Sequence, residues 1–304
     1  MKGSIAYLYR SLIHSNPNLS RISHPMQWHW FKKPSKTVAV VVPGYAREEF
    51  TSDEEISLRH MEHFLGKYDK YLIVPRGVNI HRPGFRVLGF DQGFFGSQAA
   101  NTRLMLAPSL YKRFAGYKYI LVCHLDALVL SDRLGEWCDL NLDYIAAPWI
   151  KCKDSPYVDR ERVGNGGFSL RKVESFLRVI YSNTYWVEPA AYWKSICEQT
   201  SGLARYLSLP KRYLKSFSLF NGARQEMASW HLRTDGRQNE DYFWSDEAIR
   251  YYPSFKVASV EVGLRFAFEV EPRHCFELNH GNLPFGCHAW PRYDRAFWEP
   301  YLLK

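Results

Sequence analysis

Continuous runs of β-branched and aliphatic residues, each ended by a proline or a polar residue, recur through the first half of the chain. Such runs are typical of strands buried on both faces of a sheet, whereas apolar residues spaced three or four apart predict helices. The pattern predicts strands over residues 37–43, 71–75, 85–90 and 119–124, and helices over residues 52–67 and 97–114. This alternation favours an α/β fold with a mostly parallel central sheet flanked by helices.

The pattern is weaker in the second half. It predicts a short strand over residues 143–148, a glycine-rich turn over residues 163–170 and a helix over residues 172–182. We expect an N-terminal extension over residues 1–35 and one domain over residues 36–304, with a first half (36–130) and a second half (131–304).

Residues 186–235 are rich in aromatic and basic side chains, and we expect them to form an insertion in the second half. The composition suits a lid over a binding site or a helix that lies on a membrane surface. It also suits an ordinary surface subdomain.

The overall composition is that of a globular protein, with 46% hydrophobic and 23% charged residues. Aromatic residues make up 16%, which suits contact with sugar rings and nucleobases but also fills a core. The formal charge of +9 favours a phosphate-bearing partner. Because the basic residues are scattered rather than gathered in a stripe, we expect no nucleic acid among the partners.

The six cysteines include no C-x-x-C pair, which argues against a zinc ribbon or a thioredoxin-like motif. The N-terminal stretch is too polar for a secretory leader, and no segment has the length and apolarity to cross a bilayer. We therefore expect a cytoplasmic protein, in contact at most peripherally with the inner membrane.

His124 and Asp126 interrupt an apolar run that extends from Tyr119 to Leu130. Ligands of parallel sheets bind outside the carboxyl ends of the strands, where these two residues are expected. A carboxylate among apolar neighbours has to be paired, protonated or bound to a metal. The alternative is that Asp126 caps the turn after the strand.

The stretch Asp126–Leu130 resembles the segment after the D-x-D motif of GT-A glycosyltransferases, with His124 standing where the first aspartate usually stands. The chain also resembles an uncharacterised bacterial glycosyltransferase-like family marked by five short motifs. They correspond here to His124-Leu125-Asp126, Ala147-Pro148-Trp149, Gly164–Arg171, Glu240-Asp241 and Pro284–Trp290, in that order. The resemblance covers residues 38–180 and 236–292 and implies a GT-A-like fold. It also implies that residues 36–130 are a nucleotide-binding half and that residues 131–304 are an acceptor half, in which residues 186–235 would be an acceptor lid or a surface subdomain.

This resemblance implies a divalent cation that bridges the diphosphate of a nucleotide sugar. Asp126, His124 and His288 are its expected ligands, and the histidines favour Mn²⁺ over Mg²⁺. His280 is the competing candidate for the late histidine, and a purely structural role for either histidine stays open.

The resemblance further implies Asp241 as the catalytic base that takes the proton of the acceptor hydroxyl, with Glu240 in support. A base on the face opposite the leaving group implies inversion at the anomeric carbon. The alternative is that both acids only favour the start of a helix.

The expected nucleotide-binding residues are Pro43, Tyr45, Arg47 and Arg76 at the ends of the first two strands, and Asn101 and Arg103 on the helix before Asp126. Tyr45 suits stacking on a base and Arg47 suits a phosphate. The resemblance places Trp149, Asn165, Gly166 and Gly167 beside the transferred sugar or the acceptor, whereas the glycines alone are also typical of a tight turn.

These observations predict a glycosyltransferase that uses a nucleoside-diphosphate sugar, preferably a UDP-sugar, and a glycan or lipid-linked acceptor in cell-surface polysaccharide synthesis. One alternative is a nucleotidyltransferase, although residues 43–47 are poor in glycine for its phosphate loop. Another is an inactive carbohydrate-binding protein, which His124 permits and which the presence of both Glu240 and Asp241 argues against.

Overall fold

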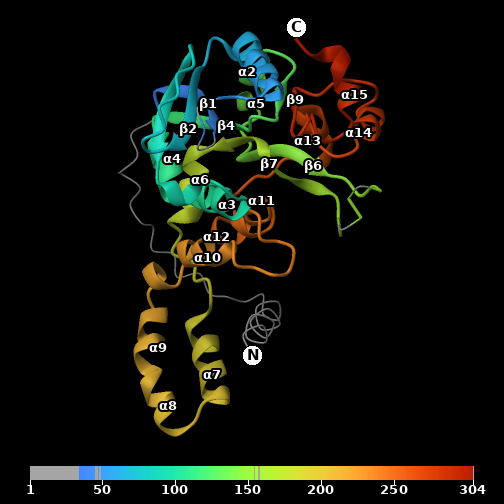
Figure 1. The fold of residues 1–304 in the computed structure, drawn as a ribbon. Coiled ribbons are helices and arrows are strands. Elements are labelled where there is room, and N and C mark those ends of the chain that lie inside the picture. The colour runs from blue at the N-terminus through green and yellow to red at the C-terminus, as the bar shows by residue number, and fades with distance from the viewer. Residues whose placement is uncertain (1–33, 45–46, 48, 154, 157, 304) are drawn as a thin grey trace. The chain divides into compact units, whose positions relative to one another are not determined.

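The computed structural model describes residues 34–44, 47, 49–153, 155–156 and 158–303 (Figure 1). The chain divides into two compact units. The larger unit spans Lys33–Ile180 and Met227–Lys304, and Tyr181–Glu226 belongs to the smaller one. Tyr45, one of the expected nucleotide-binding residues, lies outside the described residues.

A six-stranded sheet forms the centre of the larger unit. Its strands follow in the order β3 (Phe85–Phe90), β2 (Asp69–Pro75), β1 (Lys36–Pro43), β4 (Tyr117–Cys123), β7 (Arg162–Lys172) and β6 (Tyr144–Trp149). The first four are parallel, and β7 runs antiparallel to both β4 and β6. The predicted mostly parallel sheet is confirmed, and the β-branched run of β1 is buried from Val38 to Val42 because helices cover both faces.

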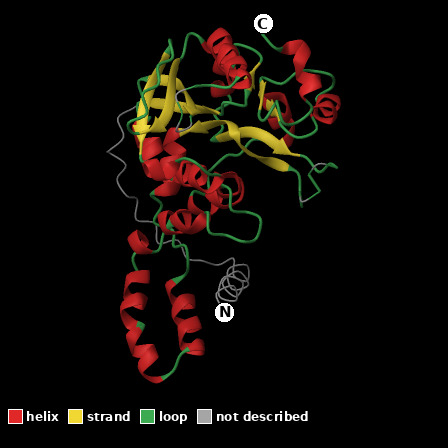
Figure 2. Cartoon of the chain, in the orientation of Figure 1, coloured by secondary structure: helices red, strands yellow, loops and turns green. Residues whose placement is uncertain are grey.

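Helices pack on both faces of the sheet (Figures 1 and 2). On one face lies α2 (Ser52–Leu65), whose start is fixed by a capping box between Thr51 and Glu54. On the other face lie α4 (Pro108–Arg113) and α6 (Val173–Ile180). Between β3 and α4 stand η1 (Gln92–Phe94) and α3 (Gln98–Leu106), and α5 (Leu134–Asp139) precedes β6.

The single helix predicted over residues 97–114 is wrong, because the chain forms two helices that meet at Pro108. Ala107 has an extended conformation (ψ 130°), and Pro108 is the first residue of α4. A proline lacks the backbone N–H that a helix interior needs and disfavours helical geometry in the residue before it. Pro108 therefore ends one helix and starts the next.

The glycine-rich turn predicted over residues 163–170 is also wrong. These residues belong to β7, an eleven-residue strand that is buried between β4 and β6. The pairing of β6 with β7 shifts register on both sides of Ala147, which marks a bulge. The glycines therefore serve a strand that other groups approach closely, rather than a turn.

A second, small sheet contains β5, the strand that follows β4 in the chain. It has the order β5 (Leu128–Val129), β9 (Gly286–Cys287) and β8 (Ala267–Phe268). The Trp290 N–H donates a hydrogen bond to the Asp126 carbonyl oxygen (3.1 Å). This sheet brings the segment after β9, which contains His288, next to the end of β4.

The remaining elements of the larger unit surround these two sheets. They are α11 (Glu240–Tyr242), the π-helix η3 (Phe243–Glu247), α12 (Ala248–Tyr251), α13 (Val260–Phe266), α14 (Pro272–Leu278), α15 (Arg295–Trp298) and η4 (Glu299–Tyr301). Trp290 and Trp298 are fully buried in an apolar cluster that includes Leu128 and Phe268. This cluster fixes the C-terminal segment against the small sheet.

The smaller unit is helical over the residues from 181 to 226. It contains α7 (Pro189–Gln199), α8 (Gly202–Leu207), α9 (Leu209–Lys215), η2 (Ser218–Phe220) and the first part of α10 (Ala223–Trp230). These bounds overlap the expected insertion at residues 186–235. Across the described residues of both units, no helix combines the length and the apolarity that crossing a membrane requires.

Candidate active site

The carboxyl end of β4 presents His124 and Asp126. The His124 N–H donates to the carbonyl oxygen of Gly167 in the neighbouring strand β7 (2.8 Å), which holds the end of β4 in place. The chain then turns, so that the Ala127 N–H donates to the His124 carbonyl oxygen (3.1 Å) before β5 begins. Both side chains therefore lie at the carboxyl edge of the parallel strands, where ligands of such sheets bind.

His288 joins these two residues from the far end of the sequence. Its N–H donates to the Phe268 carbonyl oxygen (2.9 Å), and its Nε2 lies 3.3 Å from Asp126 Oδ1. The His124 and His288 rings are 5.3 Å apart between centroids and nearly perpendicular. His280, the competing candidate, is exposed beyond the end of α14.

Glu269 is a member of the site that the sequence analysis missed. Its Oε1 lies 3.0 Å from His288 Nδ1. A carboxylate on the second nitrogen fixes the orientation of a ligating imidazole and leaves its other nitrogen to the metal. Glu269 directly follows β8, in a stretch with no motif, so only the pairing of β8 with β9 reveals this role.

The three side chains fit a divalent cation. Ligand atoms from His124, Asp126 and His288 lie within 4.8 Å of one another. His124 Nε2 is buried, and among the described residues it has no hydrogen-bond partner. Burial, aided by the charge of His288, lowers the pKa of His124 to about 4, so its imidazole is neutral and can act as a ligand. Two imidazole nitrogens and one carboxylate suit Mn²⁺ or Zn²⁺ better than Mg²⁺.

Two further pKa shifts describe the charge of this cluster. Burial alone would lower the pKa of His288, but Asp126 and Glu269 outweigh it and raise the pKa to about 10. Burial alone would raise the pKa of Asp126, but His288 outweighs it and lowers that pKa below its ordinary value. A cation that binds here therefore replaces the proton shared between His288 and Asp126.

Glycines are required in β7 because side chains from other parts of the chain approach its backbone closely. A Cβ atom on Gly167 would overlap the His288 ring, and one on Gly166 would overlap the Glu240 carboxylate. Asn165 is buried, and its Oδ1 accepts a hydrogen bond from the Gly167 N–H (3.1 Å), so its side chain holds the bulge. The cation ligands and the acid pair thus lie against successive residues of one strand.

Glu240 and Asp241 begin α11 and lie on the other side of this bulge. Glu240 is only 5% exposed, and its Oε1 lies 3.3 Å from Arg171 Nη2. The backbone of Gly166 lies close enough to the Asp241 carboxylate to favour its ionised form. Burial, followed by the charges of Glu240 and Glu269, raises the pKa of Asp241 well above its ordinary value. Both acids are therefore parts of the site, in addition to standing at a helix start.

Arg171 is a second residue that the sequence analysis missed. Its side chain is fully buried. It donates to the Gly166 carbonyl oxygen (3.1 Å), to Tyr111 OH (3.0 Å) and to Glu240 Oε1 (3.3 Å). Arg171 therefore ties the glycine bulge to the acid pair. Its place as the last residue of the G-N-G-G-x-S-L-R stretch was the available signal.

Trp149 lies next to the acid pair but is itself covered. Its ring stacks on Tyr242 with centroids 4.4 Å apart, and the Arg162 guanidinium lies 4.8 Å from its centroid. A Cβ on Gly164 would overlap the same ring. Tyr242, which follows Asp241, is the partly exposed member of this stack and thus the one that faces solvent.

The expected nucleotide-binding residues are spread along the same edge of the sheet. Pro43 ends β1, and Arg47 pairs with Glu54 at the start of α2. On α3, Asn101 is partly buried, and Arg103 donates to the Gly93 carbonyl oxygen (2.6 Å). The structure brings none of these four into the described metal cluster.

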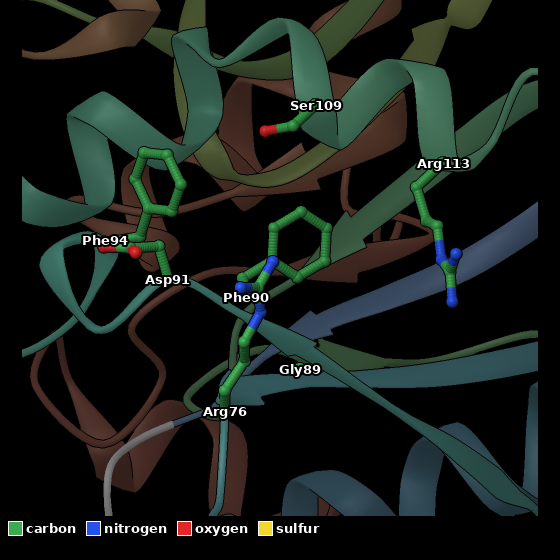
Figure 3. A pocket seen from close by; sticks show the side chains of 7 residues that line it. All are labelled: Arg76, Gly89, Phe90, Asp91, Phe94, Ser109 and Arg113. Atoms are coloured by element: carbon green, nitrogen blue, oxygen red, sulfur yellow. The ribbon is translucent and has the colours of Figure 1, made fainter.

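Arg76 lies at a cavity beyond β2 and β3 (Figure 3). The cavity measures about 400 Å³ and is open to solvent. Its lining consists of Arg76, Gly89, Phe90, Asp91, Phe94, Ser109 and Arg113. Two guanidinium groups beside two aromatic rings suit an anionic group attached to a planar one. Phe90, Phe94 and Arg113 carried no sequence signal of this kind.

Fold and site together define an α/β protein with a candidate cation site at the carboxyl edge of a mostly parallel sheet. The chain belongs to the family described as "Protein of unknown function (DUF5672)", which matches residues 84–288. That match extends from the start of β3 to His288. No curated protein sequence matches the chain.

Three solved structures are similar to the chain. A glycosyltransferase involved in the glycosylation of the major capsid of PBCV-1 is 10% identical, with a TM-score of 0.43, and the match covers 87% of this chain and 98% of that one. The galactosyltransferase LgtC in complex with donor and acceptor sugar analogues is 13% identical, with a TM-score of 0.44, and the match covers 86% of this chain and 93% of that one. A 4-diphosphocytidyl-2C-methyl-D-erythritol synthase is 13% identical, with a TM-score of 0.29, and the match covers 48% of this chain and 79% of that one. Similarities at these scores assign no activity to the chain.

Proposed function

We propose that this chain is a cation-assisted glycosyltransferase that moves a sugar from a nucleoside diphosphate to a hydroxyl of a glycan or lipid-linked acceptor. The observation that carries the proposal is the bulge of β7. Gly167 lies against the cation ligand His288, and the next residue toward the N-terminus, Gly166, lies against Glu240, the neighbour of Asp241. Successive Cα atoms are only about 3.8 Å apart, so a cation site and a candidate base adjoin one space.

The cation would be held by His124, Asp126 and His288, with Glu269 orienting His288. It would neutralise the negative charge that develops on the leaving nucleoside diphosphate. Mn²⁺ is the proposed ion, since two of the three ligands are imidazole nitrogens. The preferred donor is a UDP-sugar.

Asp241 is the proposed base. It would accept the proton of the acceptor hydroxyl as the oxygen forms its bond to the anomeric carbon. Its burial and raised pKa make it a stronger base once it is ionised. The Gly166 backbone would favour its ionised form, and Arg171 holds the neighbouring Glu240. A base opposite the leaving group entails inversion at the anomeric carbon.

The donor and acceptor would occupy the two sides of this centre. On the donor side, Arg76 and the cavity that it lines would accept the nucleoside, with Pro43, Arg47, Asn101 and Arg103 nearby along the sheet edge. On the acceptor side, Tyr242, which is stacked on the buried Trp149, would offer an aromatic surface for a sugar ring. We place the reaction in cell-surface polysaccharide synthesis on the cytoplasmic side of the membrane.

A donor-hydrolysis panel tests the proposal. UDP-, GDP- and dTDP-sugars are incubated with the full chain and Mn²⁺, with and without a chelator, and the released nucleoside diphosphate is quantified. We expect release from one donor class, abolished by the chelator and by Asp126→Asn. Asp132→Asn, a change of an exposed acid nearby, is the matched control and should leave release unchanged.

Other outcomes would contradict the proposal. Release of pyrophosphate from a nucleoside triphosphate and a sugar phosphate would indicate a nucleotidyltransferase. Glycan binding without turnover or binding of any nucleotide sugar would indicate a carbohydrate-binding protein. Turnover that is equal in wild type and Asp126→Asn would remove the cation site from the mechanism.

A further inference from the structure

The helices of the smaller unit expose a group of large apolar side chains. We call this group the apolar stripe, and its core members are Leu203, Tyr206, Leu207, Tyr213, Leu214 and Phe217. Leu203 is 75% exposed, and Tyr206 and Leu207 are each 71% exposed. Single exposed leucines are common on proteins, but a contiguous apolar group marks a contact surface.

The stripe follows the helix period. On a helix of 3.6 residues per turn, the five members from Leu203 to Leu214 fall within an arc of about 120°. Phe217 follows the end of α9 in an extended conformation, and its ring contacts that of Tyr213. Ser208, which joins α8 to α9, has helical dihedral angles (φ −88°, ψ −10°). The stripe is therefore continuous along both helices, which Figure 1 shows next to α7.

The opposite face of α9 packs on α7. The Arg212 guanidinium lies 4.8 Å from the Trp193 ring centroid, and Lys215 Nζ lies 5.1 Å from that of Trp186 and 5.8 Å from that of Tyr192. An amphipathic helix ordinarily turns its apolar side toward its neighbour and its charged side toward water. Here basic side chains contact the neighbouring aromatic rings, and the apolar side is left facing outward.

The segment that carries the stripe has charge of one sign, with Lys211 on the flank of the stripe and Arg212 and Lys215 on the opposite face of α9. The sequence from Thr200 to Gln225 contains no aspartate or glutamate, and it contains the basic residues Arg205, Lys211, Arg212, Lys215 and Arg224. A second copy of the chain seated on the stripe would bring like charges together. An anionic surface would be attracted, because Lys and Arg side chains near an anionic bilayer favour binding.

We propose that the apolar stripe docks into the interface of an anionic lipid bilayer. Leu203, Leu207 and Leu214 would enter the boundary between headgroups and acyl chains, and Tyr206 and Tyr213 would lie at the headgroup level. Lys211, on the flank of the stripe, would contact lipid phosphates. The proposal is independent of the transferase activity, because the stripe and the cation site belong to different units of the chain.

Vesicle co-sedimentation of the full-length protein tests the proposal. The vesicles are phosphatidylcholine alone or phosphatidylcholine with roughly one third phosphatidylglycerol. We expect binding to the anionic vesicles that weakens with salt, and little binding to the neutral ones. The variant Leu203→Gln/Leu207→Gln/Tyr213→Gln should lose about tenfold or more in affinity.

The matched control is Leu232→Gln/Ile249→Gln, which removes two leucine-sized side chains that are 69% and 54% exposed in the larger unit. It should bind as the wild type does. Equal binding to neutral and anionic vesicles, or undiminished binding by the stripe variant, would overturn the proposal. So would a concentration-dependent dimer in analytical ultracentrifugation that the stripe variant abolishes, since a second copy would then be the occupant.

Discussion

The β7 bulge and the apolar stripe depart from the usual distribution of residues in opposite directions. At the bulge, Arg171, Glu240 and His124 are ionisable groups held inside the protein. On the stripe, leucine and tyrosine side chains are held outside it. Folding favours neither arrangement, because burial of polar groups and exposure of apolar ones both cost free energy. Such departures point to sites that serve binding or chemistry.

The two regions also differ in how their residues are held. Arg171 and Glu240 at the bulge have specific partners, since Arg171 donates hydrogen bonds to Gly166, Tyr111 and Glu240. The side chains of the stripe project from helices whose opposite face is packed. Substitutions should therefore be costly to stability at the bulge and nearly neutral on the stripe.

The largest effect on stability is expected for Arg171→Met. The change leaves Glu240 buried without its cationic partner and should cost about 3–5 kcal/mol of unfolding free energy. The double variant Arg171→Met/Glu240→Leu should recover part of this loss. Urea denaturation measures each value, and Arg160→Met, which breaks an exposed pair with Asp246, should cost under about 1 kcal/mol. Equal costs for Arg171→Met and Arg160→Met would contradict the assigned role.

The next effect is expected for Gly167→Ala. The added Cβ would overlap the His288 ring, and relieving the overlap should cost about 1–3 kcal/mol and displace a cation ligand. Urea denaturation and Mn²⁺ titration measure the two consequences. Gly116→Ala is the matched control, because a Cβ there meets no atom within 4 Å. Unchanged Mn²⁺ affinity in Gly167→Ala would show that His288 is not positioned as described.

A smaller, pH-dependent effect is expected at His60, far from the site. His60 Nδ1 donates to the Val129 carbonyl oxygen (2.8 Å), and Nε2 accepts from the Leu303 N–H (2.9 Å), so the ring is neutral. Burial is the main cause that lowers the pKa of His60. Its contribution to stability is therefore complete above the unfolded pKa of about 6.5 and declines as the pH falls below it.

The variant His60→Gln checks this sign. It should be less stable than the wild type by about 1–2 kcal/mol at neutral pH, and the difference should shrink toward pH 5. Urea denaturation at several pH values measures the difference. A difference that grows as the pH falls would mean that His60 is charged in the folded protein.

The smallest effect on stability is expected on the stripe. The triple variant Leu203→Gln/Leu207→Gln/Tyr213→Gln should change the unfolding free energy by no more than about 0.5 kcal/mol, as is usual for surface changes. The contrasting change Leu121→Ala, in the fully buried strand β4, should cost about 2–5 kcal/mol. Thermal and urea denaturation compare them. A large loss in the triple variant would indicate that the stripe is a packed surface.

The sequence was informative where local pattern decides the structure. Apolar runs predicted β1 to β4, because a strand buried on both faces needs them. His124 and Asp126 were found since they interrupt such a run. The motifs also pointed to Glu240, Asp241 and His288, and the metal and catalytic roles of these residues stay predictions.

The local sequence pattern did not predict features of the structure that contacts between distant residues decide. The glycines of β7 suggested a turn, yet they are small because Trp149, Glu240 and His288 approach them from other parts of the chain. Glu269 gave no local signal of its role, and the motif that contains Arg171 did not reveal its contact with Glu240, since these partners lie 19 and 69 residues away. Such pairings follow from sheet order, which single-residue patterns do not contain.

Calorimetric titration of Mn²⁺ into the full chain tests the central claim most directly, namely that His124, Asp126 and His288 form one cation site. The account predicts binding at one site with release of a proton, which buffers of different ionisation enthalpy detect. Asp126→Asn and His288→Ala should each abolish this binding, and Asp132→Asn should preserve it. Equal Mn²⁺ binding by wild type and Asp126→Asn, or no binding by the wild type, would contradict the account.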